Sequence, residues 1–148
     1  MTLSPKITPF LWFESQAKEA AEYYVGIFPD SRIVSENPFV VAFEICGQRF
    51  STLNGGPHDQ FNDAVSFMVD CKDQQEVDHY WNRLIADGGR ESMCGWLKDK
   101  YGVAWQIVPE ALPRLINHPD RARAQKAIDA MLKMRKIVVA ELEAAFDS

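Results

Sequence analysis

The chain has 148 residues, of which 47% are hydrophobic and 25% are charged, and its formal net charge is −5. This balance is typical of a globular domain, and the negative charge argues against general binding to nucleic acid. No apolar stretch approaches the roughly 18 residues of a membrane span, so we expect neither a nucleic acid nor a membrane as a partner. Residues 1–6 contain no apolar signal core, and the three cysteines form no C-x-x-C pair. We therefore expect a cytoplasmic protein with reduced thiols.

The first third of the chain predicts a strand, a helix and three further strands. The apolar run 8–13 predicts the first strand. Alanines and aromatic residues at helical spacing predict a helix from about residue 16 to 28, with Ser15 as its N-cap. The three following strands are expected at 33–34, 39–46 and 50–54.

The same order of elements is expected again after a linker rich in turn residues, 54–60. A strand at 64–69 precedes a helix whose first turn carries Asp73 and Glu76, a variant of the capping box. The glycines after Asp87 end this helix. Three further strands are expected at 90–93, 94–98 and 103–108.

The last part of the chain differs from the two preceding parts. Pro109 and Pro113 interrupt the strand pattern, and Asp120 is placed to cap one long helix that reaches about Phe146. This helix has an apolar stripe and several basic side chains. Because acidic residues follow and the whole chain is acidic, we interpret the basic side as a solvated face or a subunit contact.

The chain contains an internal repeat with an offset of about 57 residues, which relates Phe10 to Phe67 and Tyr24 to Trp81. The repeat predicts two similar modules, 7–57 and 63–109, followed by a C-terminal extension, 110–148, all within a single domain, 1–148. Tyr24 and Trp81 are expected at matching helix positions that face their sheets. Two such sheets facing each other would form a cleft.

Several segments resemble one known family. They include 7–13 (ITPFLWF), 52–57 (TLNGGP) and 94–109 (CGWLKDKYGVAWQIVP). These resemble the PhnB-like group, often labelled 3-demethylubiquinone-9 3-methyltransferase, of the vicinal oxygen chelate superfamily, which includes glyoxalases, bleomycin resistance proteins and dioxygenases. The resemblance implies an α+β fold of two tandem βαβββ modules plus a C-terminal helix, a cleft for a small-molecule ligand, and a homodimer.

Two functions remain open at this point. One is a metal-free binding protein, like the antibiotic-sequestering members of the superfamily. The other is a metal-dependent enzyme of the glyoxalase or dioxygenase type. Methyl transfer from S-adenosylmethionine is not expected, because such folds need a glycine-rich turn between a strand and a helix. The two glycine pairs here, Gly55-Gly56 and Gly88-Gly89, lie at a linker and after a helix.

The metal-dependent members imply ligands of His, Gln or Glu type on strands of both modules. The first strand offers Thr8, Phe10 and Trp12, and its repeat offers Ala64, Ser66 and Met68. Gln106 stands where metal-dependent members usually carry Glu, and the three histidines lack ligand spacing. A catalytic zinc normally has three protein ligands. We therefore expect no metal and no cofactor.

The candidate ligand-binding residues are polar or aromatic side chains on the expected strands. They are Trp12, Thr52, Asn54, Ser66, Trp96 and Gln106. Aromatic side chains on a concave sheet can bind planar or apolar molecules, although for each single Trp a place in the core is the favoured interpretation. Gln106 could likewise be a buried amide and Ser66 a small packing residue. If Gln106 faces the cleft, Ala104 and Val108 share its side.

Overall fold

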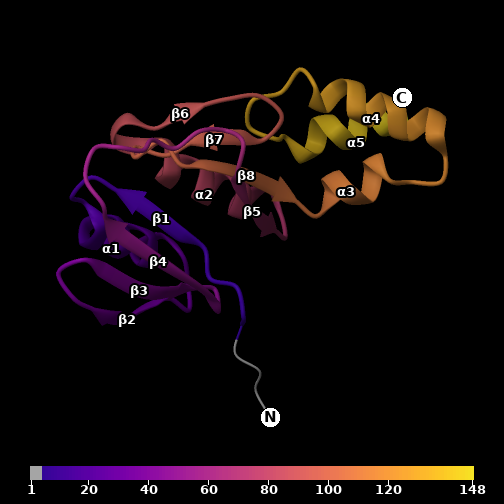
Figure 1. Cartoon of the computed structure of the whole chain (residues 1–148). Helices are drawn as coiled ribbons and strands as arrows, with labels where there is room; N and C mark the ends of the chain where they lie inside the picture. Colours follow the sequence, from indigo (N-terminus) through magenta and orange to yellow (C-terminus); the bar gives the residue numbers. More distant parts are fainter. Residues whose placement is uncertain (1–4) are drawn as a thin grey trace, which may run out of the picture. The chain divides into compact units, whose positions relative to one another are not determined.

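A computed structural model describes residues 5–148, which form two compact units, one ending at Gln60 and the other beginning at Phe61. Figure 1 follows the chain through both units. The residues from which a cytoplasmic location is predicted, 1–6, lie partly outside the described range. Among residues 5–148 no helix is long and apolar enough to cross a membrane.

Unit 1 contains one helix and a four-stranded sheet in the order β1-β4-β3-β2, with β1 parallel to β4 and the other neighbours antiparallel. This is the predicted βαβββ module. Its elements are β1 (Phe10–Phe13), α1 (Ala17–Ile27), β2 (Arg32–Glu36), β3 (Val40–Ile45) and β4 (Gln48–Asn54).

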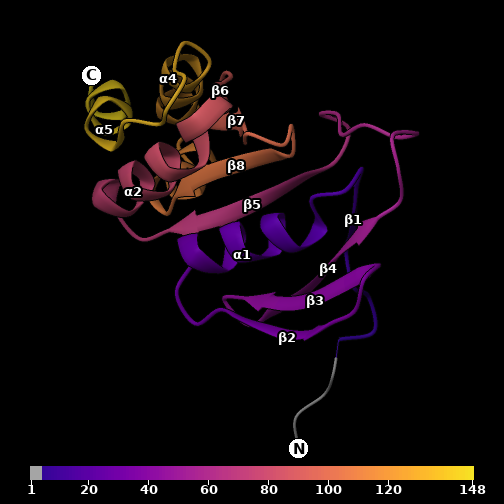
Figure 2. The ribbon, with the colours of Figure 1, turned by 90° about the vertical axis from the view of Figure 1, so that its left-hand side faces the viewer.

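Helix α1 covers one face of this sheet, as Figure 2 shows. Its alanines are fully buried, and the Tyr24 ring, 1% exposed, stacks on Phe43 with 6.2 Å between ring centroids. Phe43 in turn stacks on Phe50 of the next strand. The prediction that Tyr24 faces the sheet is therefore confirmed, and aromatic packing joins the helix to two strands.

The predicted cap of α1 by Ser15 is wrong. The helix begins after Gln16, whose side chain makes no capping bond. The first backbone N–H, that of Ala17, instead donates to Oδ1 of Asn54 at the end of β4, over 2.8 Å. A side chain from a distant strand thus satisfies one of the donors that a helix start leaves open. Local sequence cannot reveal such a partner.

Unit 2 repeats this arrangement with a sheet in the order β5-β8-β7-β6, where β5 is parallel to β8. The equivalence β1/β5, β2/β6, β3/β7 and β4/β8 confirms the duplicated βαβββ fold. The elements are β5 (Ser66–Cys71), α2 (Gln74–Ile85), a short 3-10 turn η1 (Ala86–Gly88), β6 (Arg90–Glu91), β7 (Trp96–Lys98) and β8 (Ala104–Pro109).

Helix α2 begins as predicted, because Asp73 accepts a hydrogen bond from the Glu76 backbone N–H at 2.9 Å. Trp81 occupies the position equivalent to Tyr24 and is also only 1% exposed. Its indole Nε1–H donates to Oε1 of Glu91 in β6 at 3.1 Å. The matching positions of the two aromatic residues are thus confirmed.

A buried carboxylate organises the hairpin between β7 and β8. Asp99 is 2% exposed. Its Oδ1 accepts from the backbone N–H groups of Tyr101 and Val103, at 2.9 and 3.1 Å, and its Oδ2 accepts from Trp105 Nε1 at 2.9 Å. One side chain thereby fixes both the turn and the first half of β8.

The C-terminal extension contains three helices, and the last two replace the single long helix predicted from Asp120 to Phe146, so that prediction is wrong. They are α3 (Ala111–Ile116), α4 (Arg121–Met131) and α5 (Val139–Asp147). Asp120 does cap α4, by accepting from the Arg123 backbone N–H at 3.3 Å. The helix ends after Met131 because residues 134–139 form backbone hydrogen bonds with the rest of unit 2. Figure 1 shows α3 continuing from the end of β8, with α4 and α5 beside it.

The extension has its own apolar core, which is continuous with the end of β8. The core residues are Val108, Leu112, Leu115, Ala127, Met134, Ile137, Leu142 and Phe146. Most of the basic side chains of α4 point away from this core. Arg123 pairs with Asp147 at 2.7 Å and lies over the Phe146 ring. The exposed positions of Arg121 and Lys126 fit the predicted solvated face.

Candidate functional site

Strand alternation separates the unit 2 sheet into a helix-covered face and an open face. Trp105 and Ile107 of β8 lie on the α2 side and are buried. Gln106 lies on the opposite side, together with Ala104 and Val108, as the alternation predicts. We call this second side the open face of unit 2, because α2 does not cover it; its accessible part includes Gln106 and Met68, whereas Ala104 and Val108 are buried.

Three side chains form a row across the open face. Gln106 in β8 pairs in register with Trp96 of β7 on one side and with Met68 of β5 on the other. Trp96 and Gln106 are half-buried, whereas Met68 is 56% exposed. The row therefore places an aromatic ring, an amide and a thioether next to one another on one surface.

The amide of Gln106 is held in a defined orientation. Its Nε2 donates to Oγ of Ser66 at 2.9 Å, across the parallel pair of β5 and β8. No residue in the described range donates to Oε1 of Gln106, so this oxygen can accept a bond from a ligand. The Ser66 hydroxyl, which accepts from the amide, keeps its own proton for donation.

The open face has charged side chains at one end and apolar side chains at the other. At one end, Lys98 and Asp63 form an exposed ion pair at 3.5 Å. At the other end, Val108 is covered because it belongs to the core of the C-terminal extension. The row of Trp96, Gln106 and Met68 thus lies between a charged edge and an apolar one.

The remaining aromatic candidate, Trp12, lies in unit 1 on the side of the sheet opposite to α1. Its Nε1–H donates to the Gly56 carbonyl at 2.9 Å. Gly55 lies so close to the ring that a Cβ at that position would be 2.3 Å from ring atoms. Trp12 therefore packs against the backbone of the linker, and only glycine permits that approach. Phe10, two residues earlier on the same side, is 55% exposed.

Thr52 and Asn54 lie on the α1 side of the sheet, which is opposite to Trp12. The Thr52 hydroxyl is fully buried and donates to the Ala17 carbonyl at 2.8 Å. Asn54 accepts from the Ala17 N–H and donates to the Pro38 carbonyl at 3.3 Å. These bonds hold the start of α1, so neither residue shares a surface with Trp12. Within unit 2, the structure brings Ser66, Trp96 and Gln106 together.

Met68 is the member of the row that the candidate residues omit. It lies two residues after Ser66 on a strand, so alternation alone puts the two on one side. The spacing of Ser66 and Met68 is therefore the feature of the sequence that could have identified Met68 as a site residue. The pairing of Met68 with Gln106 depends on the register of β5 against β8, which the sequence does not state.

The electrostatics of the row are weak, because none of its side chains is ionised at neutral pH. Cys71, at the end of β5, is buried, and burial raises its thiol pKa to about 12. This thiol therefore stays protonated and unreactive at neutral pH. Within residues 5–148, no group of three His, Cys, Asp or Glu side chains could hold a metal ion.

The duplicated βαβββ fold defines the class of protein by its architecture, two four-stranded mixed sheets that are each packed against one helix. Within this class, residues 5–108 match the family described as 3-demethylubiquinone-9 3-methyltransferase. The match covers well over half of the chain, and the chain belongs to this family. No functionally curated protein matches it.

Solved structures agree with this assignment. The chain is similar to a PhnB protein from Bacillus cereus, with 31% identity and a TM-score of 0.65 over 71% of this chain and 99% of that chain. It also shares the fold of protein PA1353 from Pseudomonas aeruginosa, with 19% identity and a TM-score of 0.60 over 72% and 98% of the two chains. The fosfomycin resistance protein FosX from Listeria monocytogenes, solved with Mn(II) and sulfate, is 14% identical with a TM-score of 0.56 over 73% and 91%.

The residues of the open face do not fit a divalent-metal site of the kind that the fold family implies. Gln106 offers one amide oxygen, Ser66 one hydroxyl and Met68 a soft thioether. Harder ions prefer carboxylates, and zinc or iron sites use several imidazoles, thiolates or carboxylates. The metal-free expectation nevertheless stays a prediction.

Proposed function

We propose that the chain is a small-molecule-binding protein that holds an uncharged or weakly polar, planar ligand on the open face of unit 2 without a metal. The observation that carries this proposal is the Gln106–Ser66 hydrogen bond beside Trp96. It orients an amide whose Oε1 has no donor among the described residues. An amide with one end fixed and the other open is a preorganised recognition group.

The neighbours of this amide support a planar ligand. The Trp96 indole supplies a stacking surface, and Met68 supplies a polarisable, adaptable contact on the other side. Gln106 accepts one hydrogen bond from the ligand, and Ser66 can donate another. A charged ligand would lack an oppositely charged partner within the row, whereas a neutral ligand with one or two polar groups matches it.

Methyl transfer, which the family's description names, has no support in the two strand-to-helix connections of the modules. The β1–α1 connection is Glu14-Ser15-Gln16, and the β5–α2 connection is Lys72-Asp73. Neither contains a glycine that would let the backbone approach a nucleotide cofactor closely. The proposal therefore includes no S-adenosylmethionine chemistry.

The ligand proposal is tested with 2-naphthol, an uncharged planar probe with one hydroxyl group. We expect calorimetry to show saturable binding that is unchanged by a chelator and weakened about tenfold by Trp96→Ala, through loss of stacking. Gln106→Ala should also weaken binding, whereas Gln125→Ala, which removes an exposed amide from α4, should not. A melting temperature that rises with nickel, zinc or iron and loses this gain in Gln106→Ala would contradict the metal-free proposal. It would favour a glyoxalase- or dioxygenase-type enzyme.

A homodimer and a cytoplasmic location complete the proposal. The absence of a disulfide among Cys46, Cys71 and Cys94, all within the described range, supports a reducing compartment.

For the dimer, exposed apolar side chains support contact with a second copy of the chain, since Phe10 is 55% and Phe39 71% exposed. Light scattering at tens of micromolar should give twice the chain mass of 16.8 kDa. A strict monomer would contradict the dimer.

A further inference from the structure

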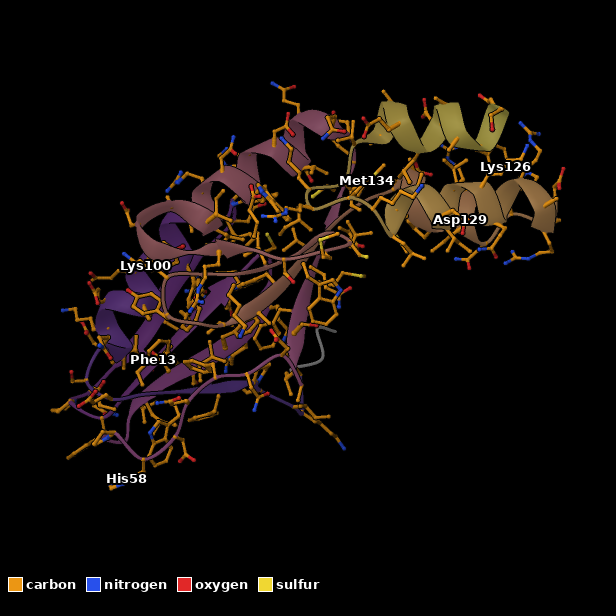
Figure 3. All side chains as sticks on the ribbon, turned by 90° about the horizontal axis from the view of Figure 1, so that it is seen from above. Phe13, His58, Lys100, Lys126, Asp129 and Met134 are labelled. Atoms are coloured by element: carbon orange, nitrogen blue, oxygen red, sulfur yellow. The ribbon has the colours of Figure 1, made fainter. Side chains whose placement is uncertain are left out.

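The C-terminal extension pairs directly with the backbone that leads into Trp96. The N–H of Cys94 donates to the Met134 carbonyl, and the N–H of Gly95 donates to the Arg135 carbonyl, both at 2.8 Å. These bonds precede β7, whose first residue is Trp96. In Figure 3, Met134 lies where the extension meets the strands of unit 2. The extension, which lies beyond the family match at 5–108, thus contacts the edge of the proposed site.

Gln74 ties this part of the extension to helix α2. Its Oε1 accepts from the Val139 N–H at 2.7 Å, and its Nε2 donates to the Ile137 carbonyl at 3.0 Å. The same Nε2 donates to Oδ1 of Asp78 one helical turn later, at 3.0 Å. Gln74 therefore bonds the chain on both sides of Val138, the residue that precedes α5.

A salt bridge reinforces the same junction. Lys136 approaches Oδ1 of Asp78 to 2.8 Å, and this bond lowers the pKa of the Asp78 carboxyl from its ordinary value. Asp78 therefore stays charged at neutral pH and holds both Lys136 and the Gln74 amide. Both ends of this network are partly exposed, so its main contribution is geometry rather than stability.

Gly95 has no room for a side chain between the extension and β8. Its φ is +83°, and a Cβ there would lie 3.0 Å from Cγ1 of Ile137 and 3.1 Å from the Ile107 carbonyl oxygen. The Gly95 carbonyl also accepts from the Ile107 N–H at 2.8 Å. Movement of residues 134–137 is therefore transmitted through Gly95 to Trp96 on one side and to β8 on the other.

We infer that Gln74 is a positioning residue for the proposed ligand site, because it fixes segment 134–137 against Cys94 and Gly95 and so holds the Trp96 ring in register with Gln106. This inference deepens the proposed function and rests on it for the role of the ring. The extension then holds the start of β7, and with it the Trp96 ring, in place on the open face. Removing the Gln74 side chain makes segment 134–137 more mobile, and it removes no residue that contacts the ligand.

The test uses full-length protein labelled with 5-fluorotryptophan. The four tryptophans give four fluorine resonances, and Trp96→Phe identifies the one that belongs to Trp96. Without ligand, Gln74→Ala should shift or broaden the Trp96 resonance and leave that of Trp12, in unit 1, in place. The Kd for 2-naphthol should rise about fivefold, because an ordered aromatic side chain becomes mobile.

The matched control is Gln125→Ala, which removes a similar i,i+4 bond to Asp129, 2.9 Å long, on α4. Figure 3 labels Asp129 on that helix. The control should leave all four resonances and the Kd unchanged. Gln74→Glu, which keeps the acceptor for Val139 but places a carboxylate oxygen against the Ile137 carbonyl and the charged Asp78, should shift the Trp96 resonance at least as much as Gln74→Ala.

An unchanged Trp96 resonance in folded Gln74→Ala would overturn the inference, and so would equal broadening of all four resonances. Failure of the proposed function has a different signature. In that case 2-naphthol leaves the wild-type Trp96 resonance unmoved, while the ligand-free spectra still report whether Gln74 positions the ring.

Discussion

Replacing Asp99 with alanine is expected to lower the free energy of unfolding by about 4 kcal/mol, because a buried hydrogen-bonded carboxylate is lost and its donors remain buried. The donors are the backbone N–H groups of Tyr101 and Val103 and the indole N–H of Trp105. Urea unfolding followed by circular dichroism measures the change. The substitution should also disturb the proposed site, because Trp105, which loses its bond to Asp99, is the residue before Gln106 in β8.

The control for Asp99 is Asp129→Ala, which removes an exposed carboxylate that accepts one bond from Gln125. Its effect should stay within about 0.5 kcal/mol, as for most surface substitutions. Asp99→Asn should be less harmful than alanine, since its amide oxygen can still accept from the Tyr101 and Val103 N–H groups and only the bond from Trp105 is lost. A loss below about 1 kcal/mol in Asp99→Ala would contradict the structural role assigned to this residue.

Replacing Trp81 with alanine is expected to cost about 4 kcal/mol, the usual range for removing a large aromatic side chain from a core. Trp81 is 1% exposed between α2 and the sheet. Trp81→Phe keeps most of the apolar volume and loses the bond to Glu91, so it should cost clearly less. The same urea titration distinguishes the two variants.

The internal repeat supplies a second comparison for Trp81. Tyr24 occupies the equivalent position in unit 1 and is equally buried. Tyr24→Ala should therefore destabilise the protein to a similar extent, whereas Tyr23→Ala, at the adjacent half-buried position, should have a smaller effect. Equal effects at Tyr23 and Tyr24 would show that the repeat does not define the core.

The duplicated fold was predictable because its signals are local and occur twice. Apolar runs mark β1 and β5, helical spacing marks α1 and α2, and the offset between the copies relates Tyr24 to Trp81. The cap at Asp73 follows from a short motif and is confirmed. The wrong cap at Ser15 shows the limit of such motifs, because the actual partner, Asn54, comes from a strand that is distant in sequence.

The candidate site was only partly predictable, because strand alternation fixes which residues share a side but not which side the helix covers. Thr52 and Asn54 lie two residues apart on β4, so alternation puts them on one side. That side proves to be under α1, where their polar groups bond to Ala17. Ser66 and Gln106 were each candidates, and their hydrogen bond depends on parallel pairing between strands about 40 residues apart.

The extension was the least predictable part of the fold. Its apolar pattern continues from α4 into α5, so one long helix satisfies the sequence. Tertiary bonds outweigh that pattern, because Gln74, Cys94 and Gly95 bond to residues from Met134 to Val139 and hold the segment between α4 and α5 outside a helix. Helix propensity is a weak preference that such contacts commonly override.

The central claim is that a small molecule binds on the open face of unit 2, beside Met68. The most direct test is a nuclear magnetic resonance titration of protein with carbon-13-labelled methionine methyl groups, in which 2-naphthol is added stepwise. The chain has five methionines, and Met68→Leu identifies one of the signals. We predict a saturable shift of the Met68 methyl signal that needs about tenfold more 2-naphthol in Trp96→Ala, with the buried Met134 signal little changed. Saturation of binding with no change at Met68, or an equal shift of all methionine signals, would contradict the proposed site.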